Sequence, residues 1–344
     1  MAVIERDIAI DMGSMNTRIY VSGRGITLRE PTLVAVNRDT GRLLKTGEEA
    51  KKILGRTPSD IVPIHPISAG VISDYDMTCA LLKVFLGRVT TRSLFKPKVL
   101  ITVPASISGV EERAMIDAAV EAGARRVFLL ESSLASAVGA GVDINKPNGR
   151  LIVDIGGGTT EIAVISLGGV VISESIKTAG VVFDEAIVRY VRRKHNLLIG
   201  RRTAEEIKQS IGCVFPKDNV SYQEISGRCL LTGLGRSITM SSSDIFEALE
   251  EPVGEITDAI LGVLEKTPPE LVADISKNGI ILCGGSSQLW GMDKLVRSVT
   301  KIETILVDDP ASCTAFGTGR MLQNIYQMNE GMINLARKKG MNLA

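Results

Sequence analysis

The chain has 344 residues, of which 44% are hydrophobic and 23% are charged, and its formal net charge is +1. This length favours two domains, and the near-zero charge gives no electrostatic reason to expect a nucleic-acid partner. The five cysteines are scattered and only two histidines accompany them. We therefore expect free, buried thiols and no structural zinc site.

The N-terminal residues lack the apolar stretch of a secretory signal, because Glu5, Arg6 and Asp7 interrupt it. No later window of about 18 residues is apolar and free of charge, so no membrane-spanning helix is expected. These observations predict a cytoplasmic protein.

Short apolar runs of strand length alternate with longer stretches of helical periodicity, which predicts an α/β fold. Ser108 followed three residues later by Glu111 is typical of a helix capping box, and Gly123 is a typical helix end. The expected elements are strands at 8–10, 99–103, 151–153 and 280–282, and helices at 110–122, 183–194 and 203–211.

One motif occurs twice. In residues 11–17 and again in residues 154–160, an Asp precedes a Gly by two positions and a Thr by six. The copies lie 143 residues apart, each directly after an expected strand, and each is followed by a second β-like run at 18–21 or 161–165. The repeat predicts two similar α/β halves, each opening with a strand–loop–strand hairpin.

Both repeated loops have the chemistry of a phosphate site. Glycines let backbone N–H groups approach an anion, and hydroxyl and amide side chains add donors. An Asp at each strand end suits Mg²⁺, which prefers carboxylate oxygens. A single glycine-rich hairpin is often only a turn, but two of matched spacing favour a polyphosphate held from both sides. The candidate ligands are Gly13, Ser14, Asn16, Thr17, Gly156, Gly157, Gly158, Thr159 and Thr160 for phosphate, and Asp11 and Asp154 for the metal.

Two further segments are candidates for holding the nucleoside. A glycine cluster follows the strand expected at 280–282, and glycine permits close approach of an adenosine to the backbone. In the helix expected at 203–211, an acid and a base one turn apart face the same way and suit ribose hydroxyls and the adenine edge; the alternative is a solvated ion pair on the helix surface. These candidates are Gly284, Gly285, Ser286, Glu205 and Lys208.

These motifs resemble the actin, sugar-kinase and heat-shock-chaperone ATPase superfamily. Longer stretches, at 95–97, 154–166, 184–188, 214–216 and 266–272, are similar to the MreB family of bacterial actins. The resemblance implies the duplicated actin-like, ribonuclease H-like fold, with two domains around a cleft that holds ATP and Mg²⁺. It implies domain I at 1–142 and 315–344 with a small subdomain at about 33–74, and domain II at 143–314 with a small subdomain at about 182–248.

The chain departs from the family pattern at two positions. The family usually has Glu-Pro, whose Glu orients the attacking water, where this chain has Ser132 and Ser133. It tends to have Gly-Asp where Val181 follows the glycine here. With Ser132 in the catalytic position beside Thr159, the resemblance implies ATP binding with weak hydrolysis, because loss of such a group lowers the rate by about 10²–10⁴-fold. An alignment shifted by one residue would instead make Glu131 the catalytic acid.

A membrane contact is expected from Leu94 and Phe95, which lie among Arg92, Lys96 and Lys98. In the family the matching loop enters the bilayer interface, and the basic flank would attract anionic lipid. The alternative is that both side chains close the edge of the core. A basic amphipathic stretch at 332–339 offers a second, weaker contact.

The resemblance implies a cytoskeletal function, in which the chain polymerises with itself into filaments under the cell membrane. A small-molecule kinase on the same fold would need a carboxylate base facing a substrate pocket, and the sequence offers no candidate beyond the loops. A chaperone-type ATPase would continue into a substrate domain, whereas this chain ends at Ala344.

Overall fold

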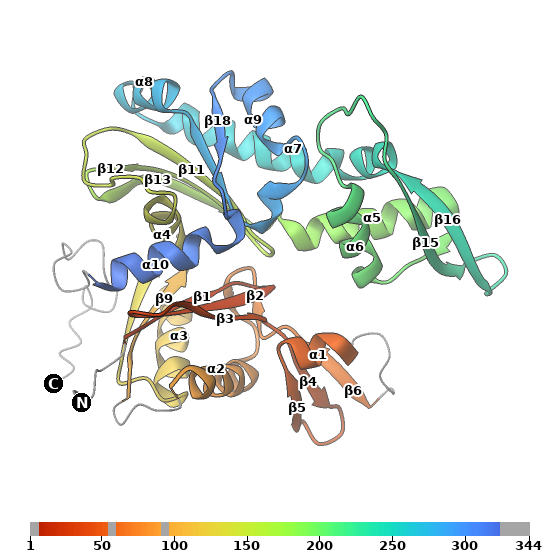
Figure 1. Ribbon diagram of the computed structural model, residues 1–344, viewed down its shortest axis with the longest axis horizontal. Coiled ribbons are helices and arrows are strands. Elements are labelled where there is room, and N and C mark those ends of the chain that lie inside the picture. Colours follow the sequence, from red (N-terminus) through yellow and green to blue (C-terminus); the bar gives the residue numbers. More distant parts are fainter. Residues whose placement is uncertain (1–6, 54–59, 91–95, 324–344) are drawn as a thin grey trace.

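The computed structural model describes residues 7–53, 60–90 and 96–323. Two large mixed sheets of the same topology dominate these residues (Figure 1). In each sheet three consecutive strands form an antiparallel meander, and two later strands continue parallel to the first strand of the meander. The predicted α/β fold and the predicted duplication are both confirmed.

The strand order is β10-β9-β1-β2-β3 in the first sheet and β13-β12-β11-β17-β18 in the second. The first sheet contains β1 (Ile8–Met12), β2 (Asn16–Val21), β3 (Gly25–Pro31), β9 (Lys98–Val103) and β10 (Arg126–Glu131). The second sheet contains β11 (Arg150–Ile155), β12 (Thr160–Ser166), β13 (Gly169–Ile176), β17 (Ile280–Cys283) and β18 (Thr304–Leu306).

The two repeated loops close their hairpins with the same hydrogen bond. The N–H of Gly13 donates to the carbonyl of Asn16 at 3.1 Å, and the N–H of Gly156 donates to the carbonyl of Thr159 at 2.9 Å. The central strands are buried on both faces, as their continuous apolar runs predict. The repeat seen in the sequence is therefore a repeat of backbone geometry.

Two helices lie between the large sheets and join the halves (Figure 1). They are α4 (Ser132–Gly139) and α10 (Cys313–Gln323). The helix that follows the first sheet, α4, packs on β11 and β12, whereas α10 returns to pack on β1 and β2. Their apolar residues share one core with both sheets. The predicted boundaries between domain I and domain II, at residues 142 and 315, lie just after the end of α4 and just inside α10.

Other helices share the apolar cores on the outer sides of the two large sheets. They are α2 (Tyr75–Thr90) and α3 (Gly109–Glu121) on the first, and α5 (Gly180–His195), α7 (Ser242–Lys266), α8 (Pro269–Asn278) and α9 (Met292–Thr300) on the second, with short 3-10 turns at Gly285–Gln288 and Pro310–Ser312. The predicted capping box is confirmed, because Ser108 and Glu111 exchange backbone and side-chain hydrogen bonds. Helix α5 begins three residues before the predicted start, since its first N–H groups donate to loop carbonyls of Gly156 and Gly157.

Each half also carries a small sheet, and both small sheets lie on the same side of the molecule (Figure 1). The first contains β4 (Val34–Asn37), β5 (Leu43–Thr46) and β6 (Ile61–Ile64), near α1 (Glu48–Ile53) and the short pair β7 (Ile67–Ser68) and β8 (Val71–Ile72). The second contains β14 (Leu197–Leu198), β15 (Tyr222–Cys229) and β16 (Gly235–Ser241), near α6 (Arg201–Ile211).

All five cysteines are buried free thiols, as predicted. None of the described helices is long and apolar enough to cross a membrane. The membrane candidates Leu94 and Phe95, and the stretch 332–339, lie outside the described residues.

The crossing of α4 and α10 generates a first prediction. A Cβ on Gly317 would overlap the backbone of Ala135 and Gly139, which cannot move aside as a flexible side chain would. We expect Gly317→Ala to destabilise the protein by about 1–3 kcal/mol or more, measured by thermal and urea unfolding.

Gly262→Ala in α7 is the matched control. A Cβ there meets nothing within 4 Å, so the change should leave stability equal or raise it by up to about 1 kcal/mol. Equal melting temperatures for the two variants would contradict the close crossing.

Candidate functional site

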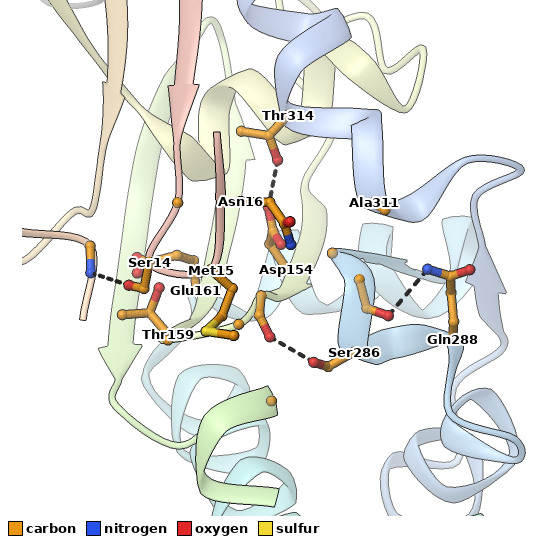
Figure 2. Close-up of a pocket in the computed structure, with 18 of the residues that line it drawn as sticks. Ser14, Met15, Asn16, Asp154, Thr159, Glu161, Ser286, Gln288, Ala311 and Thr314 are labelled. Atoms are coloured by element: carbon orange, nitrogen blue, oxygen red, sulfur yellow. Dashed lines mark hydrogen bonds between the residues drawn. The ribbon is translucent and has the colours of Figure 1, made fainter. Parts of the chain in front are cut away.

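The two repeated loops face each other across the space between the two domains (Figure 2). A Cβ added to Gly157 would lie 2.5 Å from Cγ of Met15, and one added to Gly158 would overlap the side chain of Ser14. Ser14 is itself fixed, since its Oγ accepts the N–H of Gly70 at 3.0 Å. Only glycine at both positions lets the loops come this close.

A cavity of about 740 Å³ opens beside the loops and is lined from both halves of the chain. A volume of this size is ordinary for a small-molecule or cofactor site. The residues of the sequence prediction that line it are Asp11, Gly13, Ser14, Asn16, Ser132, Asp154, Gly156, Gly157, Gly158, Thr159, Glu205, Lys208, Gly284, Gly285 and Ser286.

Two predicted phosphate ligands do not line the cavity. The side chains of Thr17 and Thr160 are fully buried behind their loops. The Oγ of Thr17 lies 2.8 Å from the hydroxyl of Thr32, and the hydroxyl of Thr160 donates to the carbonyl of Thr178 at 2.7 Å. These hydroxyls hold the hairpins to neighbouring segments instead of facing a ligand.

Asp154 lies at the end of β11 and is held by both helices that join the halves. Its Oδ2 accepts hydrogen bonds from Ser136 of α4 at 2.6 Å and from Thr314 of α10 at 2.8 Å. Gly284, at φ +85°, passes so close to Oδ1 that a Cβ would overlap it. Burial raises the pKa of Asp154, while the two hydroxyls lower it. The carboxylate is thus held rigidly at the cavity wall.

Asp11 occupies the equivalent position in the first half. Its Oδ1 accepts a hydrogen bond from Thr102 at 3.3 Å, and Arg18 lies 3.8 Å from its Oδ2. Burial raises the pKa of Asp11 to about 6; Arg18 lowers it and the nearby Asp154 raises it. The two repeated carboxylates are therefore close enough to interact, as a shared cation would require.

The junction of β10 and α4 separates the two catalytic candidates. Glu131 ends the strand and Ser132 begins the helix, so their side chains leave the backbone in different directions. Ser132 lines the cavity and Glu131 does not. Of the two candidates, only Ser132 is placed to contact a ligand of the cavity. Val181 is also absent from the cavity lining, although its N–H donates to Gly157.

Glu205 and Lys208, the two nucleoside candidates on α6, form ion pairs with other residues and not with each other. The Nζ of Lys208 lies 2.7 Å from Oδ1 of Asp184 and donates to the carbonyl of Gly180 at 2.9 Å. Glu205 lies 3.8 Å from Lys51 of α1, which belongs to the opposite half. The alternative of a surface ion pair between Glu205 and Lys208 is therefore wrong, and Glu205 contributes to a contact across the cleft.

Sequence reasoning missed a buried acid in the cavity wall, Glu161 of β12. Its Oε1 accepts a hydrogen bond from Ser175 at 2.6 Å, and its Oε2 accepts the N–H of Ala105 at 3.4 Å. Burial raises the pKa of Glu161, while hydrogen bonds from Ser175, Ala105 and Thr159 lower it. The repeat held the signal, because Glu161 stands 143 residues after Arg18. For Asp184, Ser136 and Thr314 no local pattern existed.

The buried Lys208–Asp184 pair generates the second prediction. Lys208→Met leaves a buried carboxylate without its cation, which destabilises a protein by about 3–5 kcal/mol. Burial raises the pKa of Asp184 to about 6 with the lysine present, and removing the lysine raises it further. The decrease in the free energy of unfolding should therefore have this size at pH 8. It should be smaller at pH 5, where the Asp184 carboxyl of the variant is protonated in the folded state.

Urea unfolding of wild type and Lys208→Met at both pH values measures this. Lys208→Met combined with Asp184→Asn is the control and should recover part of the loss at pH 8. A loss that does not depend on pH would contradict the assignment.

Comparisons with known proteins agree with this geometry. The chain is 49% identical to the cell shape-determining protein Mbl of Bacillus cereus over 324 residues, which cover 94% of this chain and 97% of that protein. It is 45% identical to the cell shape-determining protein MreB of Escherichia coli K12 over 329 residues, covering 94% and 95%.

Solved structures of actin-like proteins are also similar to this chain. A crystal structure of MreB 5 of Spiroplasma citri bound to AMPPNP is 37% identical, with a TM-score of 0.90 and coverage of 94% of this chain and 97% of that one. MamK in a double helical filament shares the fold, with a TM-score of 0.80, 22% identity and coverage of 92% and 98%. The profile of the MreB/Mbl protein family matches residues 5–330. The chain therefore belongs to the MreB/Mbl family of actin-like proteins.

Proposed function

We propose that this chain binds Mg·ATP in the cavity between its domains and assembles with itself into a cytoskeletal filament. The observation that carries the proposal is the contact of two equivalent glycine loops, with one carboxylate near the end of the strand before each loop, of which Asp154 is buried and Asp11 is half-buried. Structures of MreB 5 of Spiroplasma citri bound to AMPPNP and to ADP, at 37% and 36% identity, support a nucleotide in this cavity.

The residues present fit a magnesium nucleotide. Asp11 and Asp154 offer carboxylate oxygens, which Mg²⁺ prefers, and no cysteine or histidine lines the cavity within the described residues. The cation would neutralise the charge of the phosphates between the loops. Backbone N–H groups of the glycine loops, with Ser14, Asn16 and Thr159, would bind the phosphate oxygens. Glu205, Lys208 and the cluster at 284–286 would lie along the nucleoside.

Filament assembly and membrane contact rest on the family. The relatives in Bacillus cereus and Escherichia coli are both named cell shape-determining proteins, which supports a cytoskeletal role. We further propose that the filaments lie under the cell membrane, with Leu94 and Phe95 as the apolar contact. The support for this contact is the sequence alone, where both residues stand among cations.

Hydrolysis is proposed to be weak. Ser132 is the residue at the cavity wall where the family pattern has its water-orienting Glu. A serine hydroxyl is shorter than a carboxylate and a poor proton acceptor, so it orients water less well. Phosphate and metal binding depend on other residues, which are present. ATP binding and filament assembly should therefore proceed while phosphate release is slow.

Nucleotide binding is the third prediction. Asp154→Ala removes a carboxylate of the proposed metal site, so most of the affinity for Mg·ATP should be lost in calorimetry, and Asp11→Ala should act in the same direction. Asp117→Ala, an exposed acid of α3, is the control and should bind as wild type does. Electron microscopy of wild type with ATP should show filaments. The proposal would be refuted if Asp154→Ala and Asp11→Ala both kept the wild-type affinity for Mg·ATP, or if wild type with ATP showed only single particles.

Restoring the missing acid gives the fourth prediction. Ser132→Glu should raise phosphate release per filament mass by about 10-fold or more, because it returns a water-orienting carboxylate to the cavity wall. Ser132→Gln adds the same bulk without the charge and should give a much smaller gain. Paired phosphate-release and pelleting assays measure both. Robust wild-type hydrolysis that Glu131→Ala abolishes would show that Glu131 is the catalytic acid.

A further inference from the structure

Glu161 breaks the chemical symmetry of the two repeated hairpins. In the first hairpin Asp11 stands directly opposite Arg18, and the two side chains attract each other. In the second hairpin Asp154 stands directly opposite Glu161, so two acids face each other at the equivalent position. Like charges directly opposite on neighbouring strands destabilise a sheet. We therefore expect Glu161 to have a function that a basic side chain at the same position could not perform.

The other acidic side chains of the cavity wall already have ion-pair or hydrogen-bond partners within the protein. Asp11, Asp184 and Glu205 each lie within 4 Å of a basic side chain. Asp154 is held by two hydroxyls at the end of its strand. Glu161 forms no ion pair with any residue that the structure describes, and its hydrogen-bond donors are neutral. Asp154 and Glu161 are thus the two acids of the described lining without a basic side chain within 4 Å, and Glu161 is the one of them that is not already proposed as a metal ligand.

The surroundings of Glu161 place it beside the phosphate loops. It is the second residue of β12, two positions after Thr159 of the loop of the second hairpin. Figure 2 shows Glu161 and Thr159 together on the side of the site where Ser14 of the facing loop lies. A water molecule near the terminal phosphate of a nucleotide held by both loops would meet this carboxylate.

We propose that Glu161 orients the attacking water and carries the slow hydrolysis that remains with Ser132 in the place of the family acid. This rests on the proposed function. The water oxygen forms a bond to the γ-phosphorus while the bond to the β,γ-bridging oxygen breaks, and ADP leaves with that electron pair. One water proton stays on the phosphate product and the other goes to solvent. Glu161 accepts a hydrogen bond from the water throughout and is unchanged at the end.

The orientation of Glu161 depends on both domains. Ser175, on the adjacent strand of the same sheet, holds Oε1, whereas Ala105, in the segment after β9 of the other domain, holds Oε2 through its N–H. Glu161 thus has its observed position only when the two domains approach each other as they do here. Water orientation is thereby linked to closure of the cleft.

The test compares Glu161→Gln in two backgrounds. The amide can keep both neighbours, since its oxygen accepts from Ala105 and its NH₂ donates to the Ser175 hydroxyl, but it is a weaker acceptor for water. In the wild-type background we expect phosphate release to fall by about 10-fold or more, with ATP affinity and filament mass unchanged. In the Ser132→Glu background the same change should lower the rate by less than about 2-fold, because the restored acid replaces Glu161.

Glu174→Gln is the matched control, since Glu174 lies next to Ser175 but pairs with Lys266 outside the cavity. It should alter neither rate. An equal fall in both backgrounds would assign Glu161 a structural role and overturn the proposal. So would unchanged release in Glu161→Gln, or wild-type release no faster than spontaneous hydrolysis. Wild type that does not bind ATP in calorimetry would instead refute the proposed function, and the inference with it.

Discussion

The contact between the two glycine loops is the constraint on which the rest of the site depends. Gly157 and Gly158 touch Met15 and Ser14 with no room for a further carbon atom. This approach brings two carboxylates, one from each half, to the wall of one cavity, and the charge of Asp154 raises the pKa of Asp11. Such an arrangement is unfavourable when the carboxylates are charged and alone. Arg18 offsets part of that penalty, and the cation proposed above would offset more of it.

The helices that join the halves also hold the carboxylate of Asp154. Ser136 on α4 and Thr314 on α10 both donate to Asp154, and the same two helices cross through glycines at Gly139 and Gly317. A rotation of one domain against the other must move these helices, and with them the hydroxyls on Asp154. The position of this carboxylate is therefore mechanically coupled to the angle between the domains, which the proposed nucleotide-dependent assembly would use.

The sequence predicted the backbone of the site better than its side-chain chemistry. Apolar runs, the repeat and the capping box identified both hairpins and α3, because these features depend on residues close in the chain. Thr17 and Thr160 were misjudged because the pattern shows a hydroxyl but not the segment behind it. Likewise, the partner that fixes Lys208 lies 24 residues away on another helix, where no spacing rule applies. Contacts made by tertiary packing left no local signal.

Duplication explains how binding and hydrolysis can diverge in one cavity. Both halves supply a loop and a carboxylate to the cavity wall, and the second loop cannot gain a side chain at Gly157 or Gly158 without displacing the first. The positions of Arg18 and Glu161 face the same constraint of backbone geometry yet differ in charge. One stabilises its own carboxylate and the other leaves a negative charge in the cavity. The glycines of the second loop are therefore constrained by the facing loop, whereas Ser132 lines the cavity without contacting either glycine, and on the proposed function its replacement would change hydrolysis more than binding.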